Sequence, residues 1–415
     1  AHDRDPAWSP DGKKVAWFSD ESGEYRLVVR DHRGREPATS FELKGAGFYH
    51  DPVWSPDGKR ILFSDRGNRV AFVTLETGAV TTVADNPGSL GSTQPASSWS
   101  PDSAWIAFEH RDPITAYDHV DLFEVATGKL VPLTDAFGDA GSPAFSRDGK
   151  YLFFRASSDA GARQFGLDMS ASLVRKATSS LYAVVLSKTG KSPLAPRSDE
   201  GDRSLKAGER PAPGKDAPGK DGPGDGDKPT PDGDKDDKGD KDGKDEKDGK
   251  DADKDEKPSD PKEGDKQKTA KPAPKTVLDV EGLDQRIVAL PLPAGGYGSL
   301  AAVKEGLLYI ERGEDGPAVL KLFDLEERKS KDVLKAVDAF AVSANGKQLL
   351  AKAGGAWMLT TSLGKDEKRL DLDRVRVRVE PELEWRQILR EVWRIQRDYF
   401  YDPKMHGVDW NAMWA

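Results

Sequence analysis

The chain has 415 residues, a formal net charge of −9, 33% charged and 36% hydrophobic residues, and no cysteine. This length predicts two or three domains with a core that needs no disulfide or metal for stability. The lack of cysteine excludes disulfide scaffolds, thiol catalysis, zinc–thiolate sites and iron–sulfur clusters, and no apolar run approaches the roughly 18 residues of a membrane-spanning helix. The first residues contain no initiator Met and no apolar leader, and the last contain no helix cap. We therefore expect a part of a longer protein.

A sequence pattern recurs four times in the first 154 residues. In its clearest form an aromatic residue is followed by Ser-Pro-Asp-Gly and then by a run of β-formers, as in residues 51–63. The aromatic position is taken by Trp8, Trp54, Trp99 and Phe145, which are 46, 45 and 46 residues apart. A spacing this constant is typical of structural repeats.

Each repeat unit reads as four short strands. In the second unit, β-forming residues at 53–54, 60–64, 69–75 and 80–83 are separated by turn residues. The first turn, at residues 56–58, has Pro to preset its φ and Gly to accept a left-handed exit. Four-stranded units that repeat every 40–50 residues or so are the signature of β-propeller blades, which must stack around an axis because one blade cannot bury both faces.

A charged tract interrupts the fourth unit. No Val, Ile, Leu, Met, Phe, Trp or Tyr lies between Leu205 and Val277, and residues 211–270 hold 14 Lys against 17 Asp and 3 Glu. Such a composition buries too little apolar surface to offset the entropy of ordering, so we predict a disordered insertion at about 196–275. Its alternating aspartates lack the Gly and Glu positions of a calcium-binding EF-hand loop.

The fourth unit continues on both sides of this insertion. Residues 181–186 are its predicted third strand and residues 286–290 its fourth, and two degenerate units then begin at 299–310 and 338–350. The predicted fold class is therefore mainly β: a propeller of four-stranded blades over residues 1–379, with six blades visible. The beginning of an α-helical domain is predicted at 380–415.

The last segment has a helical period. After Pro381, apolar residues recur at three- and four-residue spacing and form one stripe. This stripe comprises Trp385, Ile388, Leu389, Val392, Ile395, Tyr399 and Phe400. A closed propeller offers it no obvious partner, so we expect part of it to be exposed. The charged residues of the same helix are expected to be mostly solvated; these are Arg386, Arg390, Glu391, Arg394 and Arg397.

The amino-acid sequences of two stretches resemble a known family. Residues 384–387, 391–403 and 405–410 resemble the start of the first core domain of tricorn proteases. Residues 279–291 and 294–297 resemble the second propeller of bacterial tricorn homologues. The similarity runs over essentially the whole chain except the charged insertion.

The resemblance implies a function that extends beyond this chain. Tricorn-like proteins are self-compartmentalising serine peptidases of the S41 type, with two propellers, two core domains and a PDZ-like domain. They degrade oligopeptides released by larger proteases. Their catalytic residues lie in later segments than the one that residues 1–415 resemble, so the resemblance implies a substrate-gating propeller that is inactive alone. It also implies seven blades, one of them mostly upstream of Ala1.

The resemblance further implies peptide substrates and a homo-oligomer, with no nucleic acid or membrane as partner. It is consistent with the cytoplasm, while a periplasmic or secreted location stays open. Two alternatives also stay open: a TolB-like propeller that acts as a protein-binding module, and the propeller of a prolyl-oligopeptidase-type enzyme.

No catalytic, metal-ligating or cofactor-binding residue is predicted, and no cofactor. The sequence contains no Gly-x-Ser-x-Gly elbow, Walker loop or dinucleotide fingerprint. Asp31, Asp65 and Asp102 are predicted to be turn residues. The spacing of the histidines indicates no metal cluster; they are His2, His32, His50, His110, His119 and His406. A turn or surface role is expected for His406, and His50 is expected either to face the propeller channel or to make a turn-side hydrogen bond.

Overall fold

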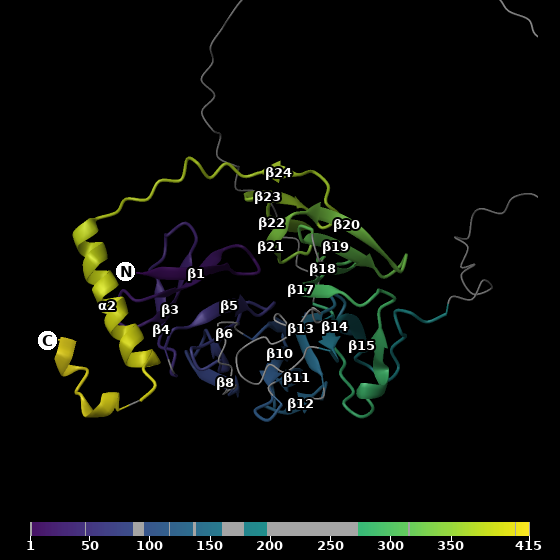
Figure 1. Ribbon diagram of the computed structural model, residues 1–415, viewed down its shortest axis with the longest axis horizontal. Coiled ribbons are helices and arrows are strands. Elements are labelled where there is room, and N and C mark those ends of the chain that lie inside the picture. Colours follow the sequence, from purple (N-terminus) through teal and green to yellow (C-terminus); the bar gives the residue numbers. More distant parts are fainter. Residues whose placement is uncertain are drawn as a thin grey trace, which may run out of the picture. The chain divides into compact units, whose positions relative to one another are not determined.

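Each repeat unit folds into a four-stranded antiparallel sheet whose strands follow one another in chain order. The computed structural model describes residues 2–45, 47–85, 95–115, 117–135, 138–159, 178–196, 273–313, 316–402 and 404–414. Six such sheets occur within these residues, which confirms the predicted propeller of four-stranded blades (Figure 1). The predicted disordered insertion lies almost wholly outside the described residues. No helix among them is both long and apolar enough to cross a membrane.

The first three blades are formed by the most regular repeats. Blade 1 comprises β1 (Asp3–Trp8), β2 (Lys14–Ser19), β3 (Arg26–Asp31) and β4 (Thr39–Phe41). Blade 2 comprises β5 (His50–Trp54), β6 (Arg60–Ser64), β7 (Val70–Thr74) and β8 (Val80–Ala84). Blade 3 comprises β9 (Ser97–Trp99), β10 (Trp105–Arg111), β11 (Asp118–Glu124) and β12 (Leu130–Pro132).

The other three blades include the interrupted unit and the two degenerate ones. Blade 4 comprises β13 (Asp139–Phe145), β14 (Tyr151–Ser157), β15 (Ser180–Val185) and β16 (Ile287–Ala289), with the short 3-10 helix η1 (Asp284–Arg286) before its last strand. Blade 5 comprises β17 (Gly296–Ala302), β18 (Gly306–Arg312), β19 (Val319–Asp324) and β20 (Lys329–Lys335). Blade 6 comprises β21 (Val337–Val342), β22 (Gln348–Ala353), β23 (Ala356–Thr361) and β24 (Lys368–Arg369).

The Ser-Pro-Asp-Gly segment forms the turn between the first two strands of a blade. In blade 2, Ser55 Oγ donates to Asp57 Oδ1 at 2.6 Å, and the backbone N–H groups of Lys59 and Arg60 donate to Asp57 and Ser55. Gly58 has a φ of +69°, the left-handed conformation that the turn requires. The same hydroxyl–carboxylate pair closes the turn in three further blades, at Ser9 and Asp11, Ser100 and Asp102, and Ser146 and Asp148.

Five hydrophobic clusters hold consecutive blades together. Each cluster draws buried residues from two neighbours, so the five join blades 1 and 2, 2 and 3, 3 and 4, 4 and 5, and 5 and 6. Among the described residues, no equivalent cluster joins blade 6 to blade 1. A cleft of about 560 Å³ lies between these two blades instead, with Trp8, Leu350 and Leu359 in its lining.

The aromatic residues of the repeats explain why blade 1 is not packed against a preceding blade. Trp54 Nε1 donates to the carbonyl of Ala7 in the preceding blade at 3.1 Å, and Trp99 Nε1 donates to that of Val53 at 3.2 Å. These two side chains are only 8% and 7% exposed, whereas Trp8, the first aromatic residue of the series, is 59% exposed. Each anchor thus fastens its blade to the one before it, and within the described part of the chain no blade precedes that of Trp8.

The C-terminal segment is helical, as predicted. After residues 370–380, which contain one turn and no regular helix or strand, α2 (Pro381–Tyr399) begins with Pro in its first turn. Two short 3-10 helices follow, η2 (Met405–Gly407) and η3 (Ala412–Trp414). Figure 1 shows α2 beside blade 1 rather than beside blade 6, which precedes it in the chain. Contacts with blade 1 residues, described below, fix this position.

Candidate functional site

The charged face of α2 contacts the propeller. Arg394 is only 1% exposed, and its guanidinium donates to Asp20 Oδ2 at 2.5 Å and to the Gly23 carbonyl at 3.0 Å. It also bonds the Glu391 carboxylate one turn earlier on the helix. The prediction that Arg394 and Glu391 are solvated is therefore wrong. Helical period shows which residues share a face, but the carboxylate that makes this face bind lies some 370 residues away in blade 1.

Further polar contacts surround this buried arginine. Gln387 Nε2 donates to Asp20 at 3.0 Å, and the Tyr25 hydroxyl donates to Glu391 at 3.0 Å. Nearer the end of the helix, Arg397 forms a two-point ion pair with Glu24, with N–O distances of 2.8 and 3.0 Å. Because α2 is joined to blade 1 mainly through charges and hydrogen bonds, the contact is specific in geometry and sensitive to pH.

The pKa values of this contact follow from burial and pairing. Burial alone would raise the pKa of Asp20, but hydrogen bonds from Gln387, the His2 backbone and Arg394 outweigh it and hold the pKa below its ordinary value. The hydrogen bonds from Arg397 lower the pKa of Glu24. Burial, followed by the charge of Glu391, raises the pKa of Tyr25, which therefore remains a neutral donor at physiological pH.

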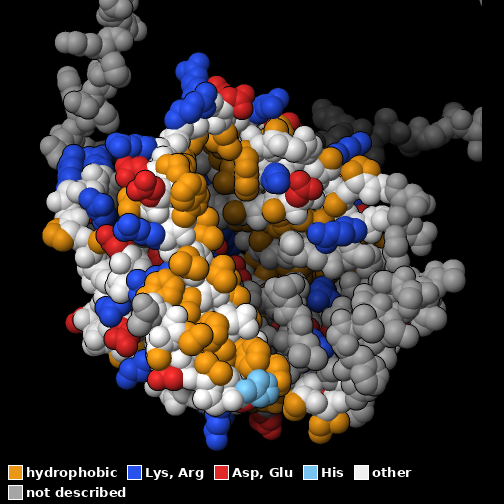
Figure 2. Space-filling view, turned by 60° about the vertical axis from the view of Figure 1, so that its left-hand side comes forward, with side chains coloured by type: hydrophobic (Ala, Val, Ile, Leu, Met, Phe, Trp, Pro, Cys, Tyr) orange, Lys and Arg blue, Asp and Glu red, His pale blue; other side chains and the backbone are white. Residues whose placement is uncertain are grey.

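Most of the apolar stripe of α2 is left uncovered by the propeller, although the Tyr399 ring packs on Phe48 with ring centroids 5.3 Å apart. Trp385, Leu389, Val392 and Tyr399 are each more than half exposed, which confirms the expectation that part of the stripe is uncovered. Figure 2, in which the side carrying α2 comes forward, shows hydrophobic side chains gathered over a broad area of that face. Exposed apolar area of this extent marks an interaction surface.

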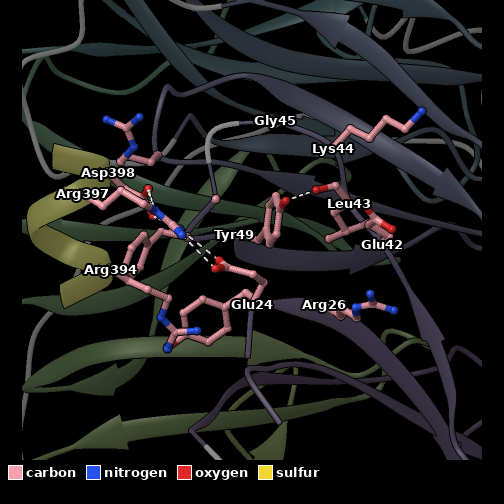
Figure 3. Close-up of a pocket in the computed structure, with 14 residues that line it drawn as sticks. Glu24, Arg26, Glu42, Leu43, Lys44, Gly45, Tyr49, Arg394, Arg397 and Asp398 are labelled. Atoms are coloured by element: carbon pink, nitrogen blue, oxygen red, sulfur yellow. Dashed lines mark hydrogen bonds and ion pairs between the residues drawn. The ribbon is translucent and has the colours of Figure 1, made fainter. Parts of the chain in front are cut away.

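A polar cleft of about 610 Å³ opens between α2 and the first two blades (Figure 3). Its lining contains five basic residues, Arg26, Lys44, Arg66, Arg394 and Arg397, and three acidic ones, Glu24, Glu42 and Asp398. None of the described residues in this lining is a serine, threonine, cysteine or histidine. The cleft is thus suited to binding a charged segment, and its described lining contains no serine, threonine or cysteine that could act as a nucleophile.

A second charged group lies on the innermost strands. The first strands of three pairs of neighbouring blades contact each other, β1 with β5, β9 with β13 and β13 with β17. Both β1 and β5 carry an Asp in a left-handed conformation, Asp5 with φ of +53° and Asp51 with φ of +51°. Arg4 contacts His50 Nδ1 at 2.5 Å and Asp5 at 3.2 Å. His50 thus lies where the sequence predicts it, at the start of an inner strand.

Desolvation shifts the pKa values of two members of this group. Burial, followed by the charge of Asp5, raises the pKa of Asp51, although its side chain is open to solvent. Burial, followed by the charge of Arg4, lowers the pKa of His50.

The opposite ends of the inner strands carry a different charged residue. Arg147, in the turn that follows β13, donates to the Ala302 carbonyl of blade 5 at 3.2 Å and to the Ser343 carbonyl of blade 6 at 3.0 Å. Burial lowers its pKa. Sequence reasoning missed this residue, although Arg replaces the Pro of the Ser-Pro-Asp-Gly turn at this one repeat and so signals a special role.

The remaining histidines occupy two kinds of place. His406 lies on the surface, where its backbone N–H donates to Asp402, as predicted. His110 and His119 meet on neighbouring strands of blade 3 beside Asp121, the one group of potential metal ligands found among the described residues. Side-chain spacing in the sequence missed this group because strand pairing, not local spacing, brings the two rings together.

The three aspartates singled out from the sequence are turn residues and do not meet. Asp31 accepts the backbone N–H groups of Arg33 and Arg35, and Asp65 accepts that of Gly67. Asp102 closes the turn of blade 3 and also accepts the backbone N–H of Thr276 at 2.7 Å.

Comparison with family models assigns both parts of the chain. Residues 1–362 match the model described as tricorn protease second beta propeller domain, and residues 381–415 match that described as tricorn protease C1 domain. The border between the two matches falls in the segment that precedes α2.

Curated relatives and a solved structure agree with this assignment. Tricorn protease homolog 1 of Streptomyces coelicolor is 27% identical over 97% of this chain, and the tricorn protease homolog of Saccharolobus solfataricus is 27% identical over 30% of it. The matched regions make up 34% and 13% of these relatives, so the chain spans about a third of the first one's length. The crystal structure of the tricorn protease superimposes with a TM-score of 0.68 at 16% identity, over 100% of this chain and 34% of that one.

Proposed function

Because this chain belongs to the tricorn protease family, where it corresponds to the second β-propeller and the beginning of the C1 domain, we propose that it is the substrate-gating part of a tricorn-like serine peptidase. The whole protein would degrade oligopeptides that larger proteases release. One observation carries this proposal: the two family matches follow each other along one chain in the order propeller, then C1 domain.

The catalytic residues of this peptidase would lie outside residues 1–415. The cleft against α2 has no serine, threonine or cysteine in its described lining, and the inner-strand group consists of Arg4, Asp5, His50 and Asp51. Neither arrangement is that of a nucleophile with an adjacent base. The role left to this chain is to admit and orient peptides, which carry a charge at each terminus.

Charged groups at both ends of the inner strands suit such a passage. The acidic side chains Asp5 and Asp51 lie near the strand starts, and the partly buried guanidinium of Arg147 lies beyond a strand end. A peptide that moves along the axis would meet carboxylates at one mouth and a guanidinium near the other. Such an asymmetry favours one orientation of a chain with an amino and a carboxyl terminus.

A seventh blade, which the family resemblance implies, would fit between blades 6 and 1. The face of blade 1 that carries Trp8 and the facing side of blade 6 lack the hydrophobic cluster that joins every other pair of neighbours among the described residues. A further blade between them would bury Trp8 as Ala7 and its neighbours bury Trp54.

We also propose homo-oligomeric assembly and a cytoplasmic location for the whole protein.

The proposal is tested first with the isolated chain. Purified residues 1–415 are expected not to hydrolyse fluorogenic tri- and tetrapeptides above a heat-denatured control. Turnover that persists after repurification and is abolished by a serine-directed inhibitor would show that catalytic residues lie within this chain.

The gating role is tested in the longer natural protein. Asp51→Lys reverses a charge at the inner-strand start and is expected to change the rate for long charged peptides more than for tripeptides. Glu76→Lys, the same charge reversal in the exposed β7–β8 turn, is the matched control and is expected to change neither rate. Equal effects of the two variants, or none from either, would contradict a passage along the axis.

A protein-binding module of the TolB type is the second candidate. The exposed apolar stripe of α2 is the observation that favours it, since such a surface suits a protein partner. The absence of peptidase activity in the longer natural protein would favour this candidate over the first.

A further inference from the structure

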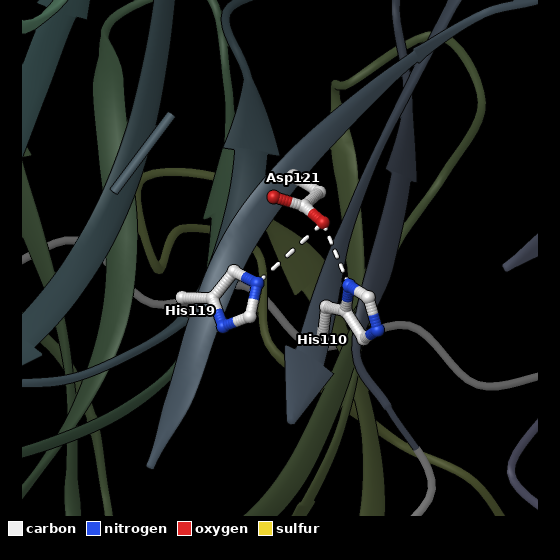
Figure 4. A group of neighbouring side chains, drawn as sticks. All are labelled: His110, His119 and Asp121. Atoms are coloured by element: carbon white, nitrogen blue, oxygen red, sulfur yellow. Dashed lines mark hydrogen bonds and ion pairs between the residues drawn. The ribbon is translucent and has the colours of Figure 1, made fainter. Parts of the chain in front are cut away.

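A group of two histidines and an aspartate lies at the junction of blades 2 and 3, away from both the helix cleft and the inner-strand group. His110 lies next to the last residue of β10 and His119 next to the first residue of β11, and the two residues are directly paired across the strands. Asp121 lies two residues beyond His119 and therefore on the same face. Figure 4 shows both imidazole rings directed at the Asp121 carboxylate.

We propose that His110, His119 and Asp121 bind one divalent transition-metal ion, with Zn²⁺ as the ion that suits them best. The ligand atoms of the three side chains lie within 4.8 Å of one another. Asp121 Oδ2 is 2.7 Å from His110 Nδ1 and 3.6 Å from His119 Nε2. Donor atoms around tetrahedral zinc are separated by about 3.3 Å, as follows from metal–ligand bonds of roughly 2.0–2.1 Å. The observed separations bracket this value, so small rotations of the side chains would complete the site.

The Asp121 carboxylate is buried, and polar atoms of this group other than the proposed donors lack hydrogen-bond partners among the described residues. Asp121 is 2% exposed, and neither its Oδ1 nor Nδ1 of His119 has a hydrogen-bond partner within the part of the chain that the structure describes. A buried carboxylate oxygen without a partner is costly in free energy. A cation bound between the rings would neutralise this carboxylate and compensate its burial.

The surroundings hold the ligands in place. Phe108 pairs with Asp121 across the two strands, and it belongs to the apolar cluster between blades 2 and 3. The backbone of Asp85, which follows β8 in blade 2, is a second hydrogen-bond partner of His110. A backbone partner is one of the groups that commonly orient a metal-binding histidine.

The donor set decides the class of ion. Two imidazole nitrogens and one carboxylate oxygen suit zinc and neighbouring first-row metals, whereas Mg²⁺ and Ca²⁺ prefer oxygen donors alone. His110 and His119 are partly exposed, with side-chain exposures of 24% and 15%, so a fourth position would be open to water. The ion would thus lie at the blade surface and fasten β10 to β11.

The chain offers matched histidines as controls. His32 lies 3.8 Å from Asp31, and His406 lies 3.3 Å from Asp402, but each pair lacks a second imidazole. Substituting either tests the effect of losing a His–Asp pair without touching the proposed site.

The first experiment is a titration of chelator-treated protein with Zn²⁺, followed by calorimetry and by the thermal midpoint. One Zn²⁺ per chain is expected to bind saturably and to raise the midpoint, because a ligand that binds only the folded state stabilises it. His110→Gln and His119→Gln are each expected to weaken binding at least about 10-fold, while His32→Gln leaves it unchanged. Binding that is absent, or equal in all four proteins, would overturn the proposal.

The second experiment uses only the unmodified protein and so does not depend on how the variants fold. Diethyl pyrocarbonate modifies accessible imidazoles, and the modified residues are located by mass spectrometry. Zn²⁺ is expected to protect His110 and His119 and to leave the modification of His32 and His406 unchanged. Equal modification of His110 and His119 with and without Zn²⁺ would show that the three residues form a hydrogen-bonded structural group only.

Discussion

Arg394 and Asp20 form an ion pair in which both side chains are almost fully buried, with exposures of 1% and 2%. Removing one partner from such a pair leaves an uncompensated charge, which costs about 3–5 kcal/mol. The pair therefore contributes less to net stability than to the choice of where α2 binds. Among the described residues of the helix, Arg394 alone is fully buried.

The pKa of Asp20 predicts how this contact responds to acid. Its folded pKa lies below the unfolded value of about 3.9, so its contribution to stability is present above that value and is lost as pH falls through the folded pKa. We expect α2 to separate from blade 1 below about pH 4. Hydrogen exchange of α2 as a function of pH measures this. Asp20→Asn should weaken the contact already at pH 7, and the exposed neighbour Glu21→Gln should behave like the unchanged protein. A helix that stays protected in Asp20→Asn would contradict the prediction.

Two tryptophans of the same repeat position allow a direct comparison. Trp54→Ala should cost about 3–5 kcal/mol of unfolding free energy, because it empties a well-packed site between blades. Trp8→Ala should cost about 1 kcal/mol or less, since this side chain is mostly exposed and contacts His32. Urea unfolding of both variants measures the difference. Equal losses would show that Trp8 is anchored, which is the result expected only in a longer chain with a blade before blade 1.

Residue types predict some local roles and miss others. The turn roles of Asp102 and Gly58 follow from sequence because a turn is made by adjacent residues. The burial of Arg394 and the meeting of His110 with His119 depend on partners that are distant in sequence or paired by register. No local pattern specifies such partners.

At the scale of elements, α2 has two faces of opposite character. The period of the sequence predicts the apolar stripe correctly, but period alone does not decide which face meets the propeller. Blade 1 presents carboxylates and carbonyls at this point, so it binds the polar face. The apolar face is thereby left for another partner, which we expect to be the remainder of the C1 domain.

Two adjacent residues of α2 allow the roles of its two faces to be tested separately. Trp393 packs on Trp410 and Trp414 rather than on the propeller, with ring centroids 6.4 and 5.5 Å apart. Trp393→Asp should therefore loosen residues 405–414 and leave the thermal midpoint of the propeller nearly unchanged. Arg394→Met, one residue further, should release the helix.

Far-UV circular dichroism with thermal melting of both variants measures this. In the longer peptidase that we propose, Trp393→Asp should disrupt the packing of the C1 domain. If it instead unfolds the isolated propeller, the helix belongs to the propeller core, and a domain border near Glu380 is wrong.

Strand positions are largely predictable from the sequence. The expected third and fourth strands of the interrupted unit, at 181–186 and 286–290, correspond to β15 and β16. The two degenerate units also begin where predicted, with β17 and β21. Repeats make this possible because each unit has the same succession of strands and turns, so a well-preserved unit identifies a degenerate one.

At the scale of the whole molecule, the charged tract is expected to contribute nothing to the folded core. Deleting residues 211–270 should change the thermal midpoint by no more than a few degrees, because the deleted residues include no large apolar side chain. Differential scanning calorimetry measures this. Leu181→Ala, in the strand before the tract, is the control and should cost about 2–5 kcal/mol, since Leu181 is fully buried. Resistance of the tract to proteases would contradict the prediction.

Among the described residues, no hydrophobic cluster joins blade 6 to blade 1, so the six blades form a linear array with two end units. In a linear array of repeats, each unit is stabilised by its neighbours, so end units open before central ones. The two ends are unequal here, because α2 holds blade 1 through Arg394 and Arg397, while the outer face of blade 6 leaves Leu350 and Leu359 lining an open cleft. Fraying should accordingly begin at blade 6 and progress toward blade 4, with blade 1 among the last units to open.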